Sequence, residues 1–259
     1  MSVALFTLFQ IIVLLFVLAG VLFILRQGRK SVRMVFFGMA MACSLLSDVY
    51  WLTFDFLYGE KRLPFAANEL AEWALFLLVG KLLITELTGE RVSVWKEVTS
   101  MTVFSAFNAA MWIYWSGEWV QDIVTGITLG YCLCGLAIRM KTTGGISRKE
   151  RTLLGIACAI IVILQVISIH AAEPAGVWFE TACYIFLMIG LAVLTVCAVT
   201  EIFIKDGTER AVCASFALLV WCLVSMYMSA GVWYYICYVG TSVAFLLMFF
   251  AMWKEVNAV

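Results

Sequence analysis

Residues 3–33 read VALFTLFQIIVLLFVLAGVLFILRQGRKSVR, a continuous apolar run that ends in a basic cluster. A helix that crosses the hydrocarbon layer of a membrane needs roughly 20 apolar residues, and Val3–Leu25 supplies that length. No basic residue precedes the run, and no A-x-A cleavage motif follows it. Because Lys and Arg concentrate in cytoplasmic loops, we predict a retained first span whose N-terminal end faces outward.

The pairing of an apolar run with a basic end recurs along the whole chain. Hydrophobic residues make up 64% of the sequence and charged residues 13%, and the mean hydropathy is +1.03. Soluble domains are about half apolar, so this composition excludes a water-exposed globular protein. All 17 Lys and Arg residues except Lys61 and Arg62 can be placed on one side of a membrane. The formal net charge is zero, so no affinity for nucleic acid is expected.

We therefore predict an all-α polytopic membrane bundle of about nine transmembrane helices, forming one transmembrane domain over 1–259 without a soluble domain. The predicted spans are 3–25, 34–56, 64–87, 98–115, 120–138, 152–171, 177–204, 211–229 and 232–253. The last two come from dividing an uncharged stretch at Ser229-Ala230-Gly231, because that stretch is too long for one crossing.

Nine spans place the N-terminus outside and the C-terminus in the cytoplasm, which satisfies the positive-inside rule. In the alternative of eight spans, one segment is re-entrant or interfacial, and a basic loop moves to the outer side. The predicted location is the inner (cytoplasmic) membrane of a cell.

The second span carries an acidic residue well inside its apolar stretch. Asp48 lies about two turns from the predicted outer end of that span. Trp51 and Asp55 follow at three and seven residues, and hence share its helical face. Ionisable residues inside a membrane are costly, and they are functional candidates by default.

Further carboxylates lie toward the predicted outer side. Glu69 and Glu72 are three residues apart near the start of the third span and share a face. Glu180 lies near the start of the seventh span, where a role at the positive end of the helix dipole is the alternative. The predicted ligand-binding residues are Asp48, Trp51, Asp55, Glu69, Glu72 and Glu180.

One basic residue, Lys81, falls within the third span rather than at its end. Its long stem allows the ammonium group to reach the inner surface by snorkelling. Alternatively, it pairs with a carboxylate, for which Glu86, Glu201 and Asp48 are the candidates. Both interpretations stay open at this stage.

Several chemistries are excluded by the residues available. His170 is the only histidine, so a His-rich zinc site or a bis-histidine haem cannot form. The sequence contains neither HExxH nor GxSxG. All nine cysteines lie in apolar stretches, where free Cys packs as a small hydrophobe. We expect no metal site and no cofactor, and no catalytic residue can be assigned.

The second and third spans, with Ser47-Asp48-Val49-Tyr50-Trp51, Arg62-Leu63-Pro64-Phe65 and Asn68-Glu69-Leu70-Ala71, resemble a hairpin in the multi-span sensor regions of bacterial signalling proteins. That resemblance covers only these two spans, and because no kinase or cyclase output domain is found in the sequence, the signalling function does not carry over. The second span alone is also similar to the multi-span lysoplasmalogenase family, although the later residues of that pattern are missing.

The leading prediction is a non-enzymatic multi-pass protein that binds a small or cationic ligand in an outer-half acidic and aromatic cavity. Carboxylates and Trp rings suit a cation through charge and cation–π attraction. The protein would act as a transporter or as a receptor or sensor subunit. The alternatives are a lipid-modifying enzyme with paired carboxylates and a structural subunit. The expected partners are the lipid bilayer, the ligand, and a membrane protein partner or second copy, but not nucleic acid.

Overall fold

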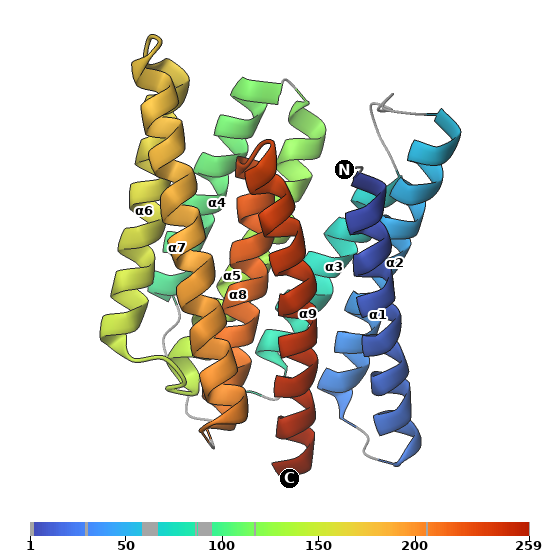
Figure 1. Cartoon of the computed structure of the whole chain (residues 1–259). Coiled ribbons are helices and arrows are strands. Elements are labelled where there is room, and N and C mark those ends of the chain that lie inside the picture. The colour runs from blue at the N-terminus through green and yellow to red at the C-terminus, as the bar shows by residue number, and fades with distance from the viewer. Residues whose placement is uncertain are drawn as a thin grey trace. The chain divides into compact units, whose positions relative to one another are not determined.

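The computed structural model describes residues 3–28, 31–58, 67–85, 87, 95–116, 118–205 and 207–258. Within these ranges all regular structure is helical, as predicted, and it forms nine helices (Figure 1). They are α1 (Val3–Arg26), α2 (Val32–Tyr58), α3 (Ala67–Ile84), α4 (Trp95–Ser116), α5 (Trp119–Thr142), α6 (Arg148–His170), α7 (Ala175–Phe203), α8 (Thr208–Met228) and α9 (Val232–Ala258).

Seven of these helices are long and apolar enough to cross a membrane, namely α1, α2 and α5 to α9. The chain is thus a multi-pass helical membrane protein. The helix α3 is not among the seven, because Glu69, Glu72 and Lys81 interrupt its 18 residues. The helix α4 is not among the seven either, and Ser, Thr and Asn residues interrupt its apolar sequence. Nine spans and an outward N-terminus remain predictions.

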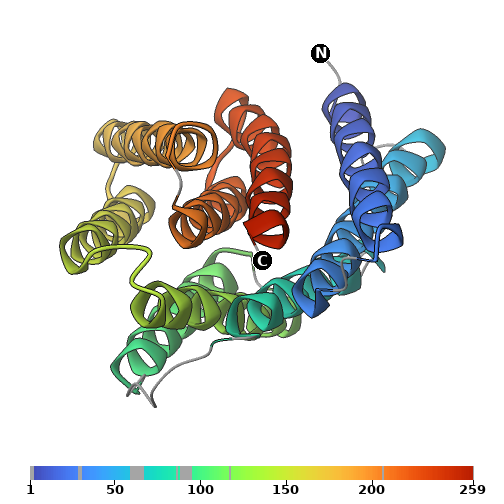
Figure 2. The same cartoon turned by 90° about the horizontal axis from the view of Figure 1, so that it is seen from below.

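Backbone contacts divide the chain into two compact units, Met1–Thr143 with Val256–Val259 and Gly144–Glu255. The first unit contains α1 to α5, which neighbour one another in the order α1, α2, α3, α5, α4. Figure 2 shows this row from blue to green. The helix α5 therefore lies between α3 and α4, although α4 precedes it in the sequence.

In the first unit, α3 and α5 run parallel. Glu69 contacts Gln121, and Trp73 contacts Thr125, so a step of four residues along α3 matches a step of four along α5. The same register continues to a close approach near Gly80, whose added Cβ would lie 2.6 Å from the Tyr131 ring. A parallel pair two helices apart in the sequence is what alternating membrane crossings require.

The second unit contains α6, α7, α8 and most of α9. Every residue from Ala211 to Cys222 of α8 is buried. The Trp221 indole lies over Gly190 of α7, where an added Cβ would be 2.1 Å from the ring. The Trp221 Nε1 also donates a hydrogen bond to the Leu187 carbonyl at 2.9 Å. This tryptophan therefore anchors α8 to α7 through both packing and a hydrogen bond.

A glycine turn separates α8 from α9. In the stretch that we divided at Ser229-Ala230-Gly231, α8 ends at Met228 and α9 begins at Val232. Gly231 has a φ of +59°, a conformation that glycine adopts without steric cost. The helix α9 continues to Ala258, beyond the predicted apolar span that ends at 253.

Candidate functional site

A set of polar side chains on α1, α2, α3 and α5 of the first unit forms four hydrogen-bonded groups. We call this set the polar belt. Its members are Gln10, Ser47, Asp48, Asn68, Glu69, Glu72, Trp73, Gln121 and Thr125. The belt lies in the C-terminal half of α2 and the N-terminal half of α3, the ends that we predict to face outward.

The first contact of the belt joins α1 to α2. Asp48 is only 6% exposed, and the Gln10 Nε2 donates to its carboxylate at 3.0 Å from Oδ2 and 3.3 Å from Oδ1. Burying a carboxylate is costly unless hydrogen bonds replace its water. The side chain of Gln10, inside the most apolar helix of the chain, supplies part of that replacement.

The next contacts join α2 to α3. The Ser47 hydroxyl donates to Glu72 Oε1 at 3.3 Å, and the Asn68 Nδ2 donates to the same oxygen at 3.4 Å. Because Ser47 and Asp48 are adjacent, α2 presents one polar side chain to α1 and one to α3. Asp48 and the partner of Glu72, Ser47, therefore lie on the same turn of α2.

The last contacts join α3 to α5. Glu69 is 3% exposed, and its Oε1 accepts a hydrogen bond of 2.5 Å from the Gln121 Nε2. One turn further along both helices, the Trp73 Nε1 donates to the Thr125 hydroxyl at 2.8 Å. The α3 helix thus directs Glu69 toward α5 and Glu72 toward α2.

The donors in these contacts are carboxamides and a hydroxyl, which are neutral. A hydrogen bond from a neutral donor to a carboxylate is charge-assisted and stronger than one between neutral groups. Such a donor replaces water around the carboxylate without cancelling its negative charge.

Trp51 lies one turn beyond Asp48 on α2, in a small aromatic cluster. Its ring is half-buried and meets Phe54 edge to face, with 6.1 Å between the centroids. Tyr50 stacks on the same Phe54 at 5.9 Å. The aromatic surface beside the acidic belt is therefore built from consecutive turns of one helix.

Besides Trp51, two more of the predicted site residues do not belong to the described belt. The backbone of Asp55 is part of α2, but its side chain lies outside the described residues. Glu180 is exposed on α7 in the second unit, where its Oε1 accepts a 2.5 Å hydrogen bond from the Tyr184 hydroxyl. Tyr184 in turn packs against Trp233 of α9 at 5.8 Å. Glu180 therefore forms a separate cluster.

Lys81 projects from α3 as an exposed side chain. Within the described part of the chain it forms no ion pair. Of the partners considered for it, Glu201 pairs with Lys205 and Arg210, Asp48 accepts from Gln10, and Glu86 lies outside the described residues. An exposed position suits the snorkelling interpretation.

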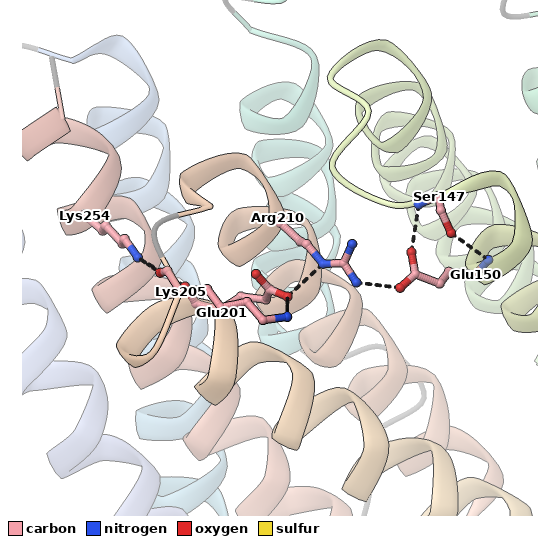
Figure 3. A network of polar contacts seen from close by, with 6 residues as sticks. All are labelled: Ser147, Glu150, Glu201, Lys205, Arg210 and Lys254. Atoms are coloured by element: carbon pink, nitrogen blue, oxygen red, sulfur yellow. Dashed lines mark hydrogen bonds and ion pairs between the residues drawn. The ribbon is translucent and has the colours of Figure 1, made fainter.

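A second polar cluster, in the second unit, has a different character (Figure 3). The Glu201 carboxylate of α7 is 5% exposed and accepts from Arg210 Nε at 2.8 Å and from Lys205 Nζ at 3.0 Å. Arg210, on α8, also reaches Glu150 of α6 at 2.5 Å. Each carboxylate in this cluster pairs with a basic side chain. The ion pairs of Arg210 link the start of α8 to the end of α7 and to the start of α6.

The ninth helix joins the same cluster through Lys254. Its ammonium group donates to the carbonyls of Glu201 and Ile202 at 3.2 Å and to that of Lys205. These carbonyls end α7, where a positive charge is favourable to the helix dipole. On α6, Ser147 and Glu150 form a capping box that fixes the start of the helix. We call this cluster the ionic clamp.

Sequence reasoning identified the carboxylates of the belt but missed their neutral partners. Gln10 was detectable as the single carboxamide within Val3–Leu25, and Asn68 as the direct neighbour of Glu69. Gln121 gave no comparable signal, because α5 begins with several polar residues. Among the described residues, no group of three or more His, Cys, Asp or Glu side chains could hold a metal ion.

Comparison with known proteins adds no relative. No family model matches the chain, and neither a curated protein nor a solved structure matches it. The functional conclusion therefore depends on the polar belt and on the apolar helices that carry it.

Proposed function

We propose that this multi-pass membrane protein binds a small cation at the polar belt, as a transporter or as the receptor part of a sensor. The observation that carries the proposal is the burial of Asp48 and Glu69, at 6% and 3% exposure, inside the same helical unit. Acidic side chains in apolar helices mark ion and substrate pathways in membrane proteins.

The arrangement favours a cation over the other ligand classes. Asp48, Glu69 and Glu72 all carry oxygen acceptors, and the hydrogen bonds described to them come from neutral side chains. A site for an anion would instead present basic side chains or backbone N–H groups. The aromatic ring of Trp51, one turn from Asp48, adds a surface that favours cations.

Cation-dependent stabilisation of the purified full chain tests this proposal. A ligand that binds only the folded protein raises its thermal unfolding temperature in proportion to the logarithm of its concentration. The chloride salts of Na⁺, K⁺ and methylammonium would be compared at one ionic strength with N-methylglucamine, whose bulk excludes it from a site between packed helices. We expect at least one of the small cations to raise the unfolding temperature.

The variants Asp48→Asn and Glu69→Gln should lose most of that rise, because each removes one charge from the belt. Glu180→Gln is the matched control, since it removes an outer-side carboxylate in the second unit and should keep the full rise. No effect of any small cation, or an equal rise in all variants, would contradict the proposal.

Proton coupling through Asp48 is the mechanism to examine first. A proton and a cation compete for the same carboxylate, so the cation effect should weaken as the pH falls. Asp48→Asn removes this competition at one position and should flatten the pH dependence. If the pH dependence and the cation affinity of Asp48→Asn equal those of the unmodified chain, Asp48 has no part in binding.

A measurement of cation flux distinguishes a transporter from a sensor. Protein reconstituted in liposomes should move the cation that stabilises it if it is a transporter. Binding without flux would favour the receptor role.

A further inference from the structure

The first turn of α6 carries three basic side chains without a partner. Arg148, Lys149 and Arg151 form no ion pair and no side-chain hydrogen bond within the described part of the chain. The other basic residues of the second unit all have partners in the ionic clamp, and these are Lys205, Arg210 and Lys254. One turn of one helix therefore holds three positive charges that no described carboxylate balances.

The acidic residue of the same turn is already paired. The Glu150 carboxylate accepts from Arg210 of α8 at 2.5 Å and from the Ser147 backbone N–H at 2.8 Å (Figure 3). Glu150 therefore faces α8 and closes the start of its own helix. The three basic residues lie on the remaining arc of the turn, because successive residues of a helix point about 100° apart.

Arg151 adds a buried N–H group to this turn. Its side chain is half-buried, and its Nε has no hydrogen-bond acceptor among the described residues. Buried N–H groups in proteins almost always have an acceptor. The guanidinium group presents its N–H groups as a planar fork that matches two oxygens of a phosphate. A phosphate at this turn would supply the acceptor that Arg151 lacks.

Beyond the basic turn, α6 exposes an apolar stripe. Only 6% of its apolar stretch is buried, the smallest share among the seven helices that can cross a membrane. Ile156, Ile163 and Ile167 are 51%, 56% and 37% exposed. They follow Lys149 at successive spacings of seven, seven and four residues, so they lie on its face of the helix.

The length of α6 places the two parts at different depths in a bilayer. Its 23 residues span about 34 Å, slightly more than the hydrocarbon layer of roughly 30 Å. The basic turn at its start therefore lies at the level of the lipid headgroups. The isoleucine stripe, which begins two turns further on, lies along the acyl chains.

We propose that the start of α6 binds an anionic phospholipid, with its phosphate at Arg148, Lys149 and Arg151 and an acyl chain along the isoleucine stripe. Basic residues next to a membrane-crossing helix attract anionic headgroups. A free phosphate would leave the apolar stripe unused, whereas a phospholipid covers both parts. This inference concerns the second unit and does not depend on cation binding at the polar belt.

A lipid titration of the purified full chain in detergent tests the inference. Phosphatidylglycerol, phosphatidylcholine with the same acyl chains, and free glycerol phosphate would be compared by the unfolding temperature, because a ligand of the folded state raises it. We expect the largest rise with phosphatidylglycerol and none with glycerol phosphate. The variant in which Arg148→Gln, Lys149→Gln and Arg151→Gln are combined should need about tenfold more phosphatidylglycerol for the same rise.

The matched control combines Arg26→Gln, Lys81→Gln and Lys96→Gln. These three residues are exposed, lie in the first unit and belong to the same predicted side of the membrane. The control therefore removes the same charge elsewhere and should keep the full response. If the α6 triple variant does not fold, the double variant Arg148→Gln with Lys149→Gln decides the question, because both side chains are exposed.

Three results would overturn the inference. An equal response of the α6 variants and the unmodified chain would show that the basic turn does not hold the lipid. An equal loss in the matched control would show a general attraction of charge without a site on α6. A rise with phosphatidylcholine or glycerol phosphate as large as that with phosphatidylglycerol would contradict recognition of an anionic lipid.

Discussion

At the scale of single residues, Gln10 supplies hydrogen bonds to the buried carboxylate of Asp48. The Gln10 carboxamide donates to both carboxylate oxygens of Asp48, across the contact between α1 and α2. Gln10→Leu keeps the size and removes the donor. We expect a loss of about 1–3 kcal/mol in the free energy of unfolding, the usual cost of a buried group left without its partner.

Thermal unfolding in detergent measures this loss. Gln27→Leu is the control, because Gln27 is exposed just after α1 and its replacement should change stability by less than about 0.5 kcal/mol. Equal stability of the Gln10 and Gln27 variants would show that the contact to Asp48 is dispensable.

The acidic residues of the candidate site could be predicted from the sequence, but their hydrogen-bond partners could not. Asp48, Glu69 and Glu72 stand out because an acidic residue in an apolar run is conspicuous in any sequence. Their donors Ser47 and Gln121 are ordinary residues there, and which helix each one faces depends on packing. The hydrogen-bond partner of each carboxylate is therefore a property of the folded chain.

At the scale of helices, the contact between α7 and α8 depends on a glycine. An added Cβ at Gly190 would lie 2.1 Å from the Trp221 indole, so the ring would have to move. The Trp221 hydrogen bond to Leu187 would move with it. We expect Gly190→Ala to destabilise the protein by about 1–3 kcal/mol, the usual cost of overpacking.

Gly155→Ala provides the contrast for that prediction. Gly155 is also within a helix, but an added Cβ there meets no atom within 4 Å. Alanine is the better helix former, so this variant should be neutral or more stable by up to roughly 1 kcal/mol. Thermal unfolding of both variants is the measurement, and a larger loss in Gly155→Ala would contradict the packing described.

The ionic clamp is a second contact between helices that can be tested. Arg210 pairs with the buried Glu201 and with the exposed Glu150. Arg210→Met should cost roughly 1–3 kcal/mol, between the values for exposed and fully buried pairs. Lys149→Met removes an exposed basic residue of the same region and should change stability little. If the two variants unfold at the same temperature, the clamp does not stabilise the unit.

Most of the helices could be predicted from the sequence, because apolar runs and glycine-rich breaks are local signals. Gly231 lies in the turn between α8 and α9, at the position where a break was predicted. The insertion of α5 between α3 and α4 could not be predicted. Neighbour relations depend on which small residues face one another, and a single sequence does not reveal these pairs.

At the scale of the whole molecule, the positive-inside rule predicts the orientation of both termini. An epitope tag at the N-terminus should be reached by antibody in intact spheroplasts. A tag at the C-terminus should be reached only after the membrane is permeabilised. Eight spans would leave both tags on the same side, and so would contradict the nine-span topology.

The central claim is that the polar belt of the first unit binds a small cation. Equilibrium binding of radiolabelled Na⁺ and of radiolabelled methylammonium to the purified full chain tests it most directly. We predict saturable binding of at least one of the two cations, retained in Glu180→Gln and lost when Asp48→Asn is combined with Glu72→Gln. Binding of neither cation, or equal binding by the combined variant, would contradict the claim.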